Sequence, residues 1–344
     1  MNSPADQPMV ETHALTKQFS AHKQTVDAVR GLDLVVERGE LVALLGPNGA
    51  GKSTTLRMLT TLVAPTSGTA RVAGYDVTSQ AKEVRRRIGY IGQGNGAGHA
   101  QRGRDELVSH GRCYGLSRAA ARARAAELVE SLDLSAVADR TVSTLSGGQR
   151  RRLDIAMGLI HGPDLLFLDE PSTGLDPQNR ANLQQHVVAL RERFGTTVLL
   201  TTHYLDEADS LAERVVVVDH GEVVADDTPD RLKAQHATEH LWLGLADRSD
   251  AAAAAAMVEA IDPSARVVID PTTSGSTRLV AQMRGATQAT PVLLHDLHAR
   301  GVTVLSAEVA RPTLDDVFLN LTGRSLREGH SVPAPTNDKQ EVFA

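Results

Sequence analysis

Residues 41–53 read Leu41-Val42-Ala43-Leu44-Leu45-Gly46-Pro47-Asn48-Gly49-Ala50-Gly51-Lys52-Ser53. The first five form a continuous apolar run, which is typical of a strand buried on both faces of a parallel sheet. The remaining eight fit the phosphate-loop pattern G-x-x-x-x-G-K-[ST]. Glycines allow backbone angles closed to other residues, so successive N–H groups can surround phosphate oxygens at the start of a helix. The stretch therefore predicts an α/β nucleotide-binding domain.

Two side chains of this loop carry specific chemistry. Lys52 is expected to reach the β- and γ-phosphates of a nucleotide, and Ser53 to offer its hydroxyl to Mg²⁺. The alternative is a glycine-rich turn followed by a chance Lys-Ser pair. The apolar run before the loop and the helical pattern from Ser53 to Leu62 argue against that alternative.

A second apolar run ends in two carboxylates. It reads Leu165-Leu166-Phe167-Leu168-Asp169-Glu170. The carboxyl end of a strand is where open α/β folds bind ligands, and phosphate-loop enzymes use an Asp at such an end to hold Mg²⁺. The alternative is an exposed helix cap followed by a charge. With the phosphate loop upstream, the pattern favours a magnesium-binding Asp169.

Between these two motifs lies the sequence Leu145-Ser146-Gly147-Gly148-Gln149. Ser146 is a good N-cap for a helix running to Ile160, and such a helix start is an anion site. A second anion site needs a second phosphate or a second chain. A capped helix without any ligand is the plainer interpretation.

In this order the three motifs resemble those of the ATP-binding subunit of ABC (ATP-binding cassette) transporters, over roughly residues 9–230. The resemblance implies an α/β phosphate-loop NTPase core with an antiparallel β subdomain and a helical subdomain at about residues 95–160. It implies ATP and Mg²⁺ as cofactors. It also implies an ATP-dependent, head-to-tail homodimer, in which LSGGQ of one subunit covers the γ-phosphate bound by the other.

The resemblance also assigns roles to single residues. Glu170 resembles the general base, His203 the histidine that contacts the γ-phosphate, and Gln93 the glutamine that senses Mg²⁺ and water. These three and Lys52 form the expected catalytic set, and the expected metal ligands are Ser53, Gln93 and Asp169. Phe19 resembles the aromatic that stacks on adenine, and Asp176 the aspartate that crosses the dimer interface. The expected ATP contacts are Phe19, Gly46, Pro47, Asn48, Gly49, Ala50, Gly51, Lys52, Ser53, Thr54, Ser146, Gly147, Gly148, Gln149 and Asp176.

Further segments resemble one branch of this family, the bacterial drug-resistance ATPases of the daunorubicin/doxorubicin type. They are Arg150-Arg151-Arg152-Leu153-Asp154, Thr202-His203-Tyr204-Leu205-Asp206-Glu207-Ala208 and Pro312-Thr313-Leu314-Asp315-Asp316-Val317-Phe318-Leu319. The branch implies a separately encoded ABC-2-type membrane permease, export of hydrophobic drugs, antibiotics or lipids, and a place at the cytoplasmic face of a bacterial cell membrane. The arginine run has a plainer interpretation as a solvated helix face. Two other functions stay open: a soluble, non-transport ABC ATPase and a regulatory ATP binder.

Composition agrees with a cytoplasmic subunit. The net charge of −6 gives no reason to expect a nucleic-acid partner, and the single cysteine excludes an intrachain disulfide framework. We find no signal-peptide pattern and no apolar stretch near the roughly 18 residues of a membrane span. We therefore expect the membrane-spanning part to be another polypeptide.

The C-terminal third predicts a separate α+β domain. Strands at 240–245, 265–270, 278–282 and 302–309, with helices at 251–261 and 291–300, give the order βαββαβ, the ferredoxin-like pattern. We expect a disordered tail at 1–8, the ATPase domain at 9–235, the accessory domain at 236–324 and a second disordered tail at 325–344.

One segment departs from the family pattern. Residues 94–98 read Gly94-Asn95-Gly96-Ala97-Gly98, where relatives usually carry apolar residues, at the place expected to receive a permease helix. The glycines predict a flexible loop with few apolar groups. The permease contact would then be polar or weak, or the loop would become ordered on docking.

Overall fold

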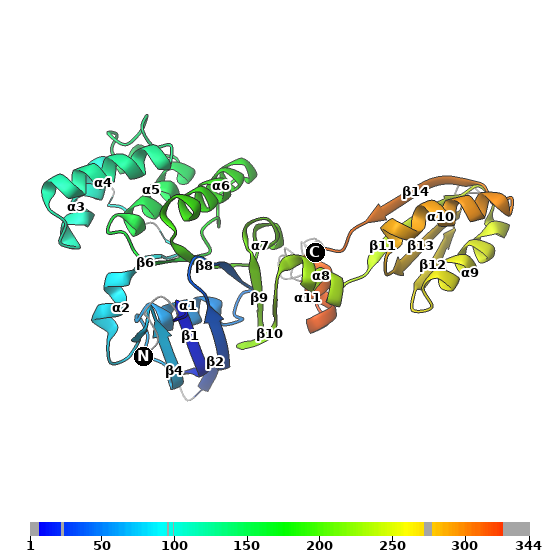
Figure 1. Ribbon diagram of the computed structural model, residues 1–344, viewed down its shortest axis with the longest axis horizontal. Helices are drawn as coiled ribbons and strands as arrows, with labels where there is room; N and C mark the ends of the chain where they lie inside the picture. The colour runs from blue at the N-terminus through cyan, green and yellow to red at the C-terminus, as the bar shows by residue number, and fades with distance from the viewer. Residues whose placement is uncertain (1–6, 22–23, 95, 99, 272–276, 326–344) are drawn as a thin grey trace, which may run out of the picture.

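The computed structural model describes residues 7–21, 24–94, 96–98, 100–271 and 277–325. The chain forms two units that lie side by side along the longest axis (Figure 1). We call the first the N-terminal unit, which contains β1 to α8 and the last helix, α11. The C-terminal unit contains β11 to β14. Most residues of both expected tails lie outside the described ranges.

A six-stranded sheet forms the middle of the N-terminal unit, in the order β10-β9-β3-β8-β7-β6. All neighbouring pairs are parallel except β10 with β9. The residues of β3, β7 and β8 are buried throughout, because layers cover both faces of the sheet. The strands are β3 (Leu41–Leu45), β6 (Ile88–Ile91), β7 (Leu165–Asp169), β8 (Thr197–Thr202), β9 (Arg214–Asp219) and β10 (Glu222–Asp227).

An antiparallel sheet with the order β2-β1-β4-β5 covers one side of the central sheet, with α1 in the core they share. This confirms the antiparallel part of the expected α/β core. Its strands are β1 (Val10–Ala21), β2 (Gln24–Val36), β4 (Ser67–Val72) and β5 (Tyr75–Asp76), and the helices near it are α1 (Lys52–Leu59) and α2 (Ala81–Arg87).

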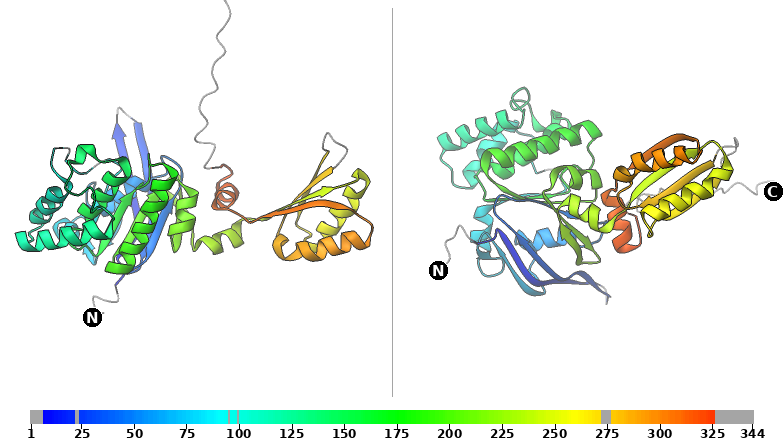
Figure 2. Two further views of the ribbon diagram at one scale, coloured as in Figure 1. Left: turned by 90° about the horizontal axis from the view of Figure 1, so that it is seen from above. Right: turned by 45° about the vertical axis from the view of Figure 1, so that its right-hand side comes forward.

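Helices cover the other side of the central sheet and share a second core with it (Figures 1 and 2). α3 and α4 pack as a hairpin, and both contact α5. These helices are α3 (Gly103–Cys113), α4 (Arg118–Ser131), α5 (Gly147–Leu159), α6 (Pro177–Phe194), α7 (Leu205–Leu211) and α8 (Pro229–His236), with a short 3₁₀ turn at Val142–Thr144. Within the described ranges, no helix has the length and apolarity that a membrane span requires.

The C-terminal unit follows the element order predicted from the sequence. Its four-stranded sheet is antiparallel throughout, in the order β12-β13-β11-β14. Both helices pack on one face of this sheet (Figure 2), where they share an apolar core. The elements are β11 (Glu239–Leu245), α9 (Ala251–Ile261) after a 3₁₀ turn at Arg248–Asp250, β12 (Arg266–Pro271), β13 (Thr277–Met283), α10 (Ala286–Ala299) and β14 (Val304–Ala310).

The last helix, α11 (Leu314–Thr322), returns to the N-terminal unit. It contacts α8 and α7, and Leu314, Val317 and Phe318 are buried in the core of the N-terminal unit. The expected accessory range of 236–324 therefore includes a helix that packs elsewhere. The spacing of these three residues shows that α11 has one apolar face, but spacing does not say which core that face covers.

Candidate active site

The phosphate loop joins β3 to α1 through backbone that only glycine adopts easily. Gly51 precedes α1 with a φ of 102°, in the left-handed region. Gly46 lies so close to the carbonyl of Val218 that a Cβ atom there would clash with it. The loop is thus built against the end of β9, with its N–H groups at the start of α1.

Lys52 lies almost fully inside this loop, with only 4% of its surface exposed. Its Nζ donates to the carbonyl oxygens of Gly46 at 2.6 Å and Pro47 at 2.9 Å. Nζ is also 3.9 Å from Oε1 of Glu170. Burial lowers the pKa of Lys52, and the carboxylates of Glu170 and Asp169 oppose that shift. A buried cation beside a carboxylate is suited to contacting an anionic ligand.

Asp169 ends β7 with none of its surface exposed. Its Oδ1 accepts hydrogen bonds from Ser53 Oγ at 2.8 Å and from Thr201 Oγ1 at 2.7 Å. Oδ2 is buried and has no hydrogen-bond partner among the described residues. Gln93 Nε2 is 3.4 Å from Ser53 Oγ. The structure therefore brings together the three residues expected to hold Mg²⁺.

Glu170 follows directly and has a strained backbone, with a φ of 48° in the left-handed region. Its Oε2 is 3.3 Å from Nδ1 of His203 and accepts a hydrogen bond from Thr173 Oγ1 at 3.2 Å. The hydrogen bond with His203 holds the pKa of Glu170 below its usual value, although burial opposes this. Glu170 is thus a carboxylate at neutral pH, held between Lys52 and His203.

LSGGQ starts α5 as predicted. Ser146 caps the helix: its Oγ accepts from Gln149 N at 3.3 Å, and Gln149 Oε1 accepts from Ser146 N at 3.0 Å. Asp176 caps α6 in the same way, accepting from Asn179 N at 2.9 Å. That hydrogen bond lowers the pKa of Asp176. A Cβ atom on Gly148 would meet the Asn179 side chain, so LSGGQ lies against the start of α6.

The phosphate loop and LSGGQ, two of the expected parts of the ATP site, are separate within one chain. α1 packs in the core beside the antiparallel sheet, whereas α5 packs in the core on the other side of the central sheet (Figure 1). Phe19 belongs to a different sheet from the carboxylates: it lies on β1 with 42% of its surface exposed, and Lys17 Nζ is 5.1 Å from its ring centroid.

Sequence reasoning missed two buried polar residues of the site. Arg151 does not lie on a solvated helix face; it is 6% exposed and donates to the carbonyl oxygens of Gly92 and Pro171, each at 2.7 Å. Its only signal in the sequence was weak: it lies four residues before Ile155 and eight before Leu159, a spacing that puts the three on one face of α5. The second is Thr201, whose only signal was the threonine pair before His203.

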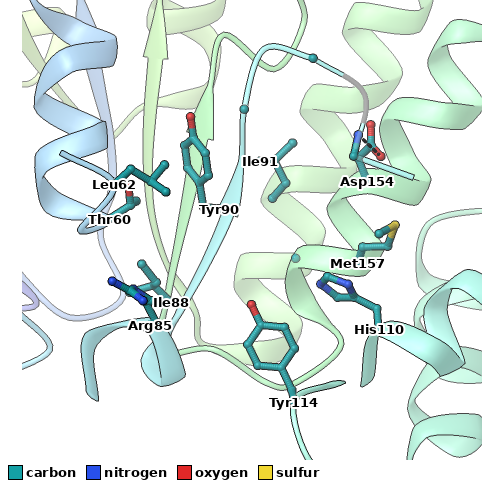
Figure 3. A pocket seen from close by; sticks show the side chains of 14 residues that line it. Thr60, Leu62, Arg85, Ile88, Tyr90, Ile91, His110, Tyr114, Asp154 and Met157 are labelled. Atoms are coloured by element: carbon teal, nitrogen blue, oxygen red, sulfur yellow. Dashed lines mark hydrogen bonds between the residues drawn. The ribbon is translucent and has the colours of Figure 1, made fainter. Parts of the chain in front are cut away.

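An apolar groove of about 490 Å³ lies beside the loop that follows Gln93. Figure 3 shows Arg85 and Leu62 on one side of it and His110, Tyr114 and Met157 on the other. Gly94 and Gly96 line it without side chains. The loop is held there by Asp154, whose Oδ1 accepts from Gly96 N at 3.0 Å and Ala97 N at 2.9 Å.

This groove bears on the expectation that the contact with a permease is polar or weak. The loop itself adds few apolar groups, as its glycines indicated, but neighbouring elements supply them. Its predicted flexibility stays a prediction, and Asn95 and His99 lie outside the described residues.

The geometry defines a phosphate-loop nucleotide site with two carboxylates beside it, the buried Asp169 and the half-buried Glu170. Comparison with known proteins gives the class. Residues 29–173 match the family model described as "ABC transporter". The chain is 44% identical over 330 residues to the daunorubicin/doxorubicin resistance ATP-binding protein of Streptomyces peucetius, covering 96% of this chain and 97% of that protein. It is 34% identical to the linearmycin resistance ATP-binding protein of Bacillus subtilis (strain 168), covering 93% and 100%.

A solved structure agrees on the fold. The ATP-binding cassette MJ0796, described as a dimer in a post-hydrolysis state bound to ADP and Pi, superposes with a TM-score of 0.59 at 27% identity, covering 64% of this chain and 98% of that one. The chain belongs to the ABC transporter family, in which it is an ATP-binding subunit that hydrolyses ATP.

Proposed function

We propose that this chain powers export of a hydrophobic drug, antibiotic or lipid through a separately encoded ABC-2-type permease, at the cytoplasmic face of a bacterial membrane. The observation that carries the proposal is the apolar groove at the loop after Gln93. A surface of this kind, next to a nucleotide site, suits a partner that must respond to the nucleotide. The two resistance ATP-binding proteins to which the chain is similar support an antibiotic as the cargo.

The residues present fit a Mg²⁺ ion. Mg²⁺ prefers oxygen ligands, and Asp169 offers a buried oxygen, Oδ2, that lacks a partner among the described residues. Ser53 and Gln93 would complete the protein's share of ligands. When bound, the ion would neutralise charge that develops on the β- and γ-phosphates. Lys52 would contact the same phosphates.

Glu170 would act as the general base. As a carboxylate it can accept a proton from water, and its hydrogen bonds to His203 and Thr173 fix the direction in which it points. In this proposal Glu170 orients and deprotonates the water, while His203 holds the carboxylate and contacts the γ-phosphate.

We infer a head-to-tail dimer as the working form. Each chain presents its phosphate loop and its LSGGQ helix on separate layers, so each holds two half-sites. Ser146, Gly147 and Asp176 would close over ATP bound to the other chain. The dimer reported for the similar cassette supports this arrangement.

The groove would receive a short helix of the permease. Its lining fits an aliphatic side chain, and the guanidinium of Arg85 at its edge fits an acidic one.

We propose that the C-terminal unit is a ferredoxin-like domain, because its element order and sheet order follow that pattern, and that it braces the dimer.

The test is to fill the groove. Gly94 lines the groove and a Cβ atom there would meet open space, so Gly94→Phe adds a ring at the groove. We expect the variant to bind ATP as the parent does but to lose co-purification with the proposed permease. Ala123→Phe, at an exposed position on α4, is the matched control. Normal co-purification of Gly94→Phe would contradict the proposed docking.

A further inference from the structure

Thr201 lies between the two carboxylates of the active site and the core of the sheet. It is on β8, directly opposite Asp169 of β7 in the parallel register, and none of its surface is exposed. A threonine in a strand is ordinary because β-branched residues suit strands. The contacts of its hydroxyl are what distinguish it.

The hydroxyl of Thr201 contacts both residues at the end of β7. It donates to Asp169 Oδ1 at 2.7 Å and accepts from the backbone N–H of Glu170 at 3.0 Å. That N–H also reaches the carbonyl oxygen of Thr201 at 3.1 Å. One side chain thus connects the carboxylate of Asp169 with the backbone of Glu170.

The contact with Glu170 supports a strained residue. A left-handed backbone costs of order 1–3 kcal/mol in a non-glycine residue and persists only where its surroundings hold it. Without this backbone conformation, the carboxylate of Glu170 would leave the position from which it reaches Lys52 and His203. The hydroxyl is part of what holds it.

The contact with Asp169 decides which carboxylate oxygen stays available. Ser53 and Thr201 both donate to Oδ1, so Oδ1 is used by the protein itself. Oδ2 is the oxygen that has no partner among the described residues. The two hydroxyls therefore fix the carboxylate so that Oδ2 is left for a ligand.

We propose that Thr201 is a positioning residue, whose hydroxyl sets both the metal-facing oxygen of Asp169 and the water-facing carboxylate of Glu170. The inference rests on the roles proposed above for those two residues. Thr201 itself would touch neither nucleotide nor metal. Its effect would appear in both hydrolysis and the Mg²⁺-dependence of nucleotide binding.

Thr197 provides a matched control. It lies on the same strand, four residues earlier and therefore on the same face, and is also buried. Its hydroxyl accepts one hydrogen bond, from Gly39 N at 2.9 Å, at the end of β8 that is far from Asp169. Replacing either threonine with valine removes a buried hydroxyl with little change in shape.

The experiment compares Thr201→Val, Thr201→Ser and Thr197→Val in the full chain. We measure kcat, and the affinity for ADP with and without Mg²⁺. For Thr201→Val we expect kcat to fall by about 10- to 100-fold, since a small misplacement of reacting groups has effects of this size. The gain in ADP affinity on adding Mg²⁺ should shrink, while ADP affinity without Mg²⁺ stays the same.

Thr201→Ser keeps the hydroxyl and should restore both properties, and Thr197→Val should match the parent in both. The proposal is overturned if Thr201→Val behaves like the parent, or if Thr201→Ser is as impaired as Thr201→Val. Equal impairment of Thr197→Val would also overturn it, because the effect would then come from stability. If the parent shows no Mg²⁺-dependence, the metal role of Asp169 falls and this inference with it; if only the variants fail to differ, the inference alone falls.

Discussion

The N-terminal unit buries charged side chains, whereas the described part of the C-terminal unit buries only apolar residues and Thr277. The buried charges of the N-terminal unit include Lys52, Arg151, Asp154 and Asp169. The C-terminal core consists of residues such as Leu243, Leu279 and Leu293. The two units thus put different chemistry into their interiors.

This difference separates function from folding. A buried charge costs free energy unless it is paired and hydrogen-bonded, so a sequence that keeps several of them in one place gains something other than stability. Of the four named here, Lys52, Arg151 and Asp169 lie at the nucleotide site, and Asp154 holds the loop beside the groove. The C-terminal core contributes apolar burial, which stabilises its own fold.

The largest expected effects come from replacing one buried residue in each unit and comparing the two variants. Lys52→Met should lower ATP hydrolysis by on the order of 100- to 1000-fold, as removal of one transition-state contact typically does. Leu279→Ala should instead destabilise the C-terminal unit by about 2–5 kcal/mol and leave hydrolysis unchanged. Steady-state ATPase assays and thermal unfolding check both. A loss of hydrolysis in Leu279→Ala would contradict the separation of function from folding between the two units.

The next prediction concerns α11, which crosses between the units. Phe318→Ala should destabilise the N-terminal unit by about 3–5 kcal/mol, because its ring is only 1% exposed in that core. Leu319 is next to it and 44% exposed, so Leu319→Ala should cost less than about 0.5 kcal/mol. Hydrogen exchange shows which helices or strands lose protection in the variant. If Phe318→Ala loosens β11 to β14 instead of α7 and α8, the assignment of α11 is wrong.

A smaller effect is expected from His161, which contacts Tyr114 of the groove lining. It stacks on Tyr114 with ring centroids 3.9 Å apart, and burial lowers its pKa to about 4 from an ordinary 6.5. The unfolded chain therefore binds the proton first, and His161 should lower stability as the pH falls from 6.5 towards 4. His161→Gln should flatten this dependence in denaturant titrations at several pH values. An unchanged slope in His161→Gln would contradict the prediction.

The smallest effect on ATP binding is expected from removing the C-terminal sheet. Residues 239–312 can be replaced by a Gly-Ser linker that keeps α11 in place. We expect ATP affinity within about threefold of the parent in calorimetry, since the nucleotide contacts lie elsewhere, and a weaker ATP-dependent dimer. The linker is needed because a simple truncation at residue 240 would also remove α11. A large loss of ATP affinity after the excision would contradict the division of labour.

The sequence predicted features that depend on neighbours along the chain. The phosphate loop, the capped helix at Ser146 and the carboxylates after β7 each follow from a short motif, because local backbone geometry decides them. The order of elements in the C-terminal unit followed from hydrophobic patterns and turn residues in the same way.

Features that depend on distant segments could not be predicted. The contact of Thr201 with Asp169 arises from the parallel register of β7 and β8, across 32 residues of chain. Arg151 is buried because carbonyl groups of two distant loops surround it. The apolar face of α11 is visible in the sequence. Its partner α8, however, is separated from it along the chain by the whole C-terminal unit.

The central claim is that two chains share each ATP site. Its most direct test is the oligomeric state of Glu170→Gln with and without MgATP, measured by light scattering after size-exclusion chromatography. Removing the general base should trap the ATP-bound state, so the account predicts a monomer without nucleotide, a dimer with MgATP and almost no hydrolysis. A variant that binds ATP with the parent's affinity and stays monomeric would contradict the shared site.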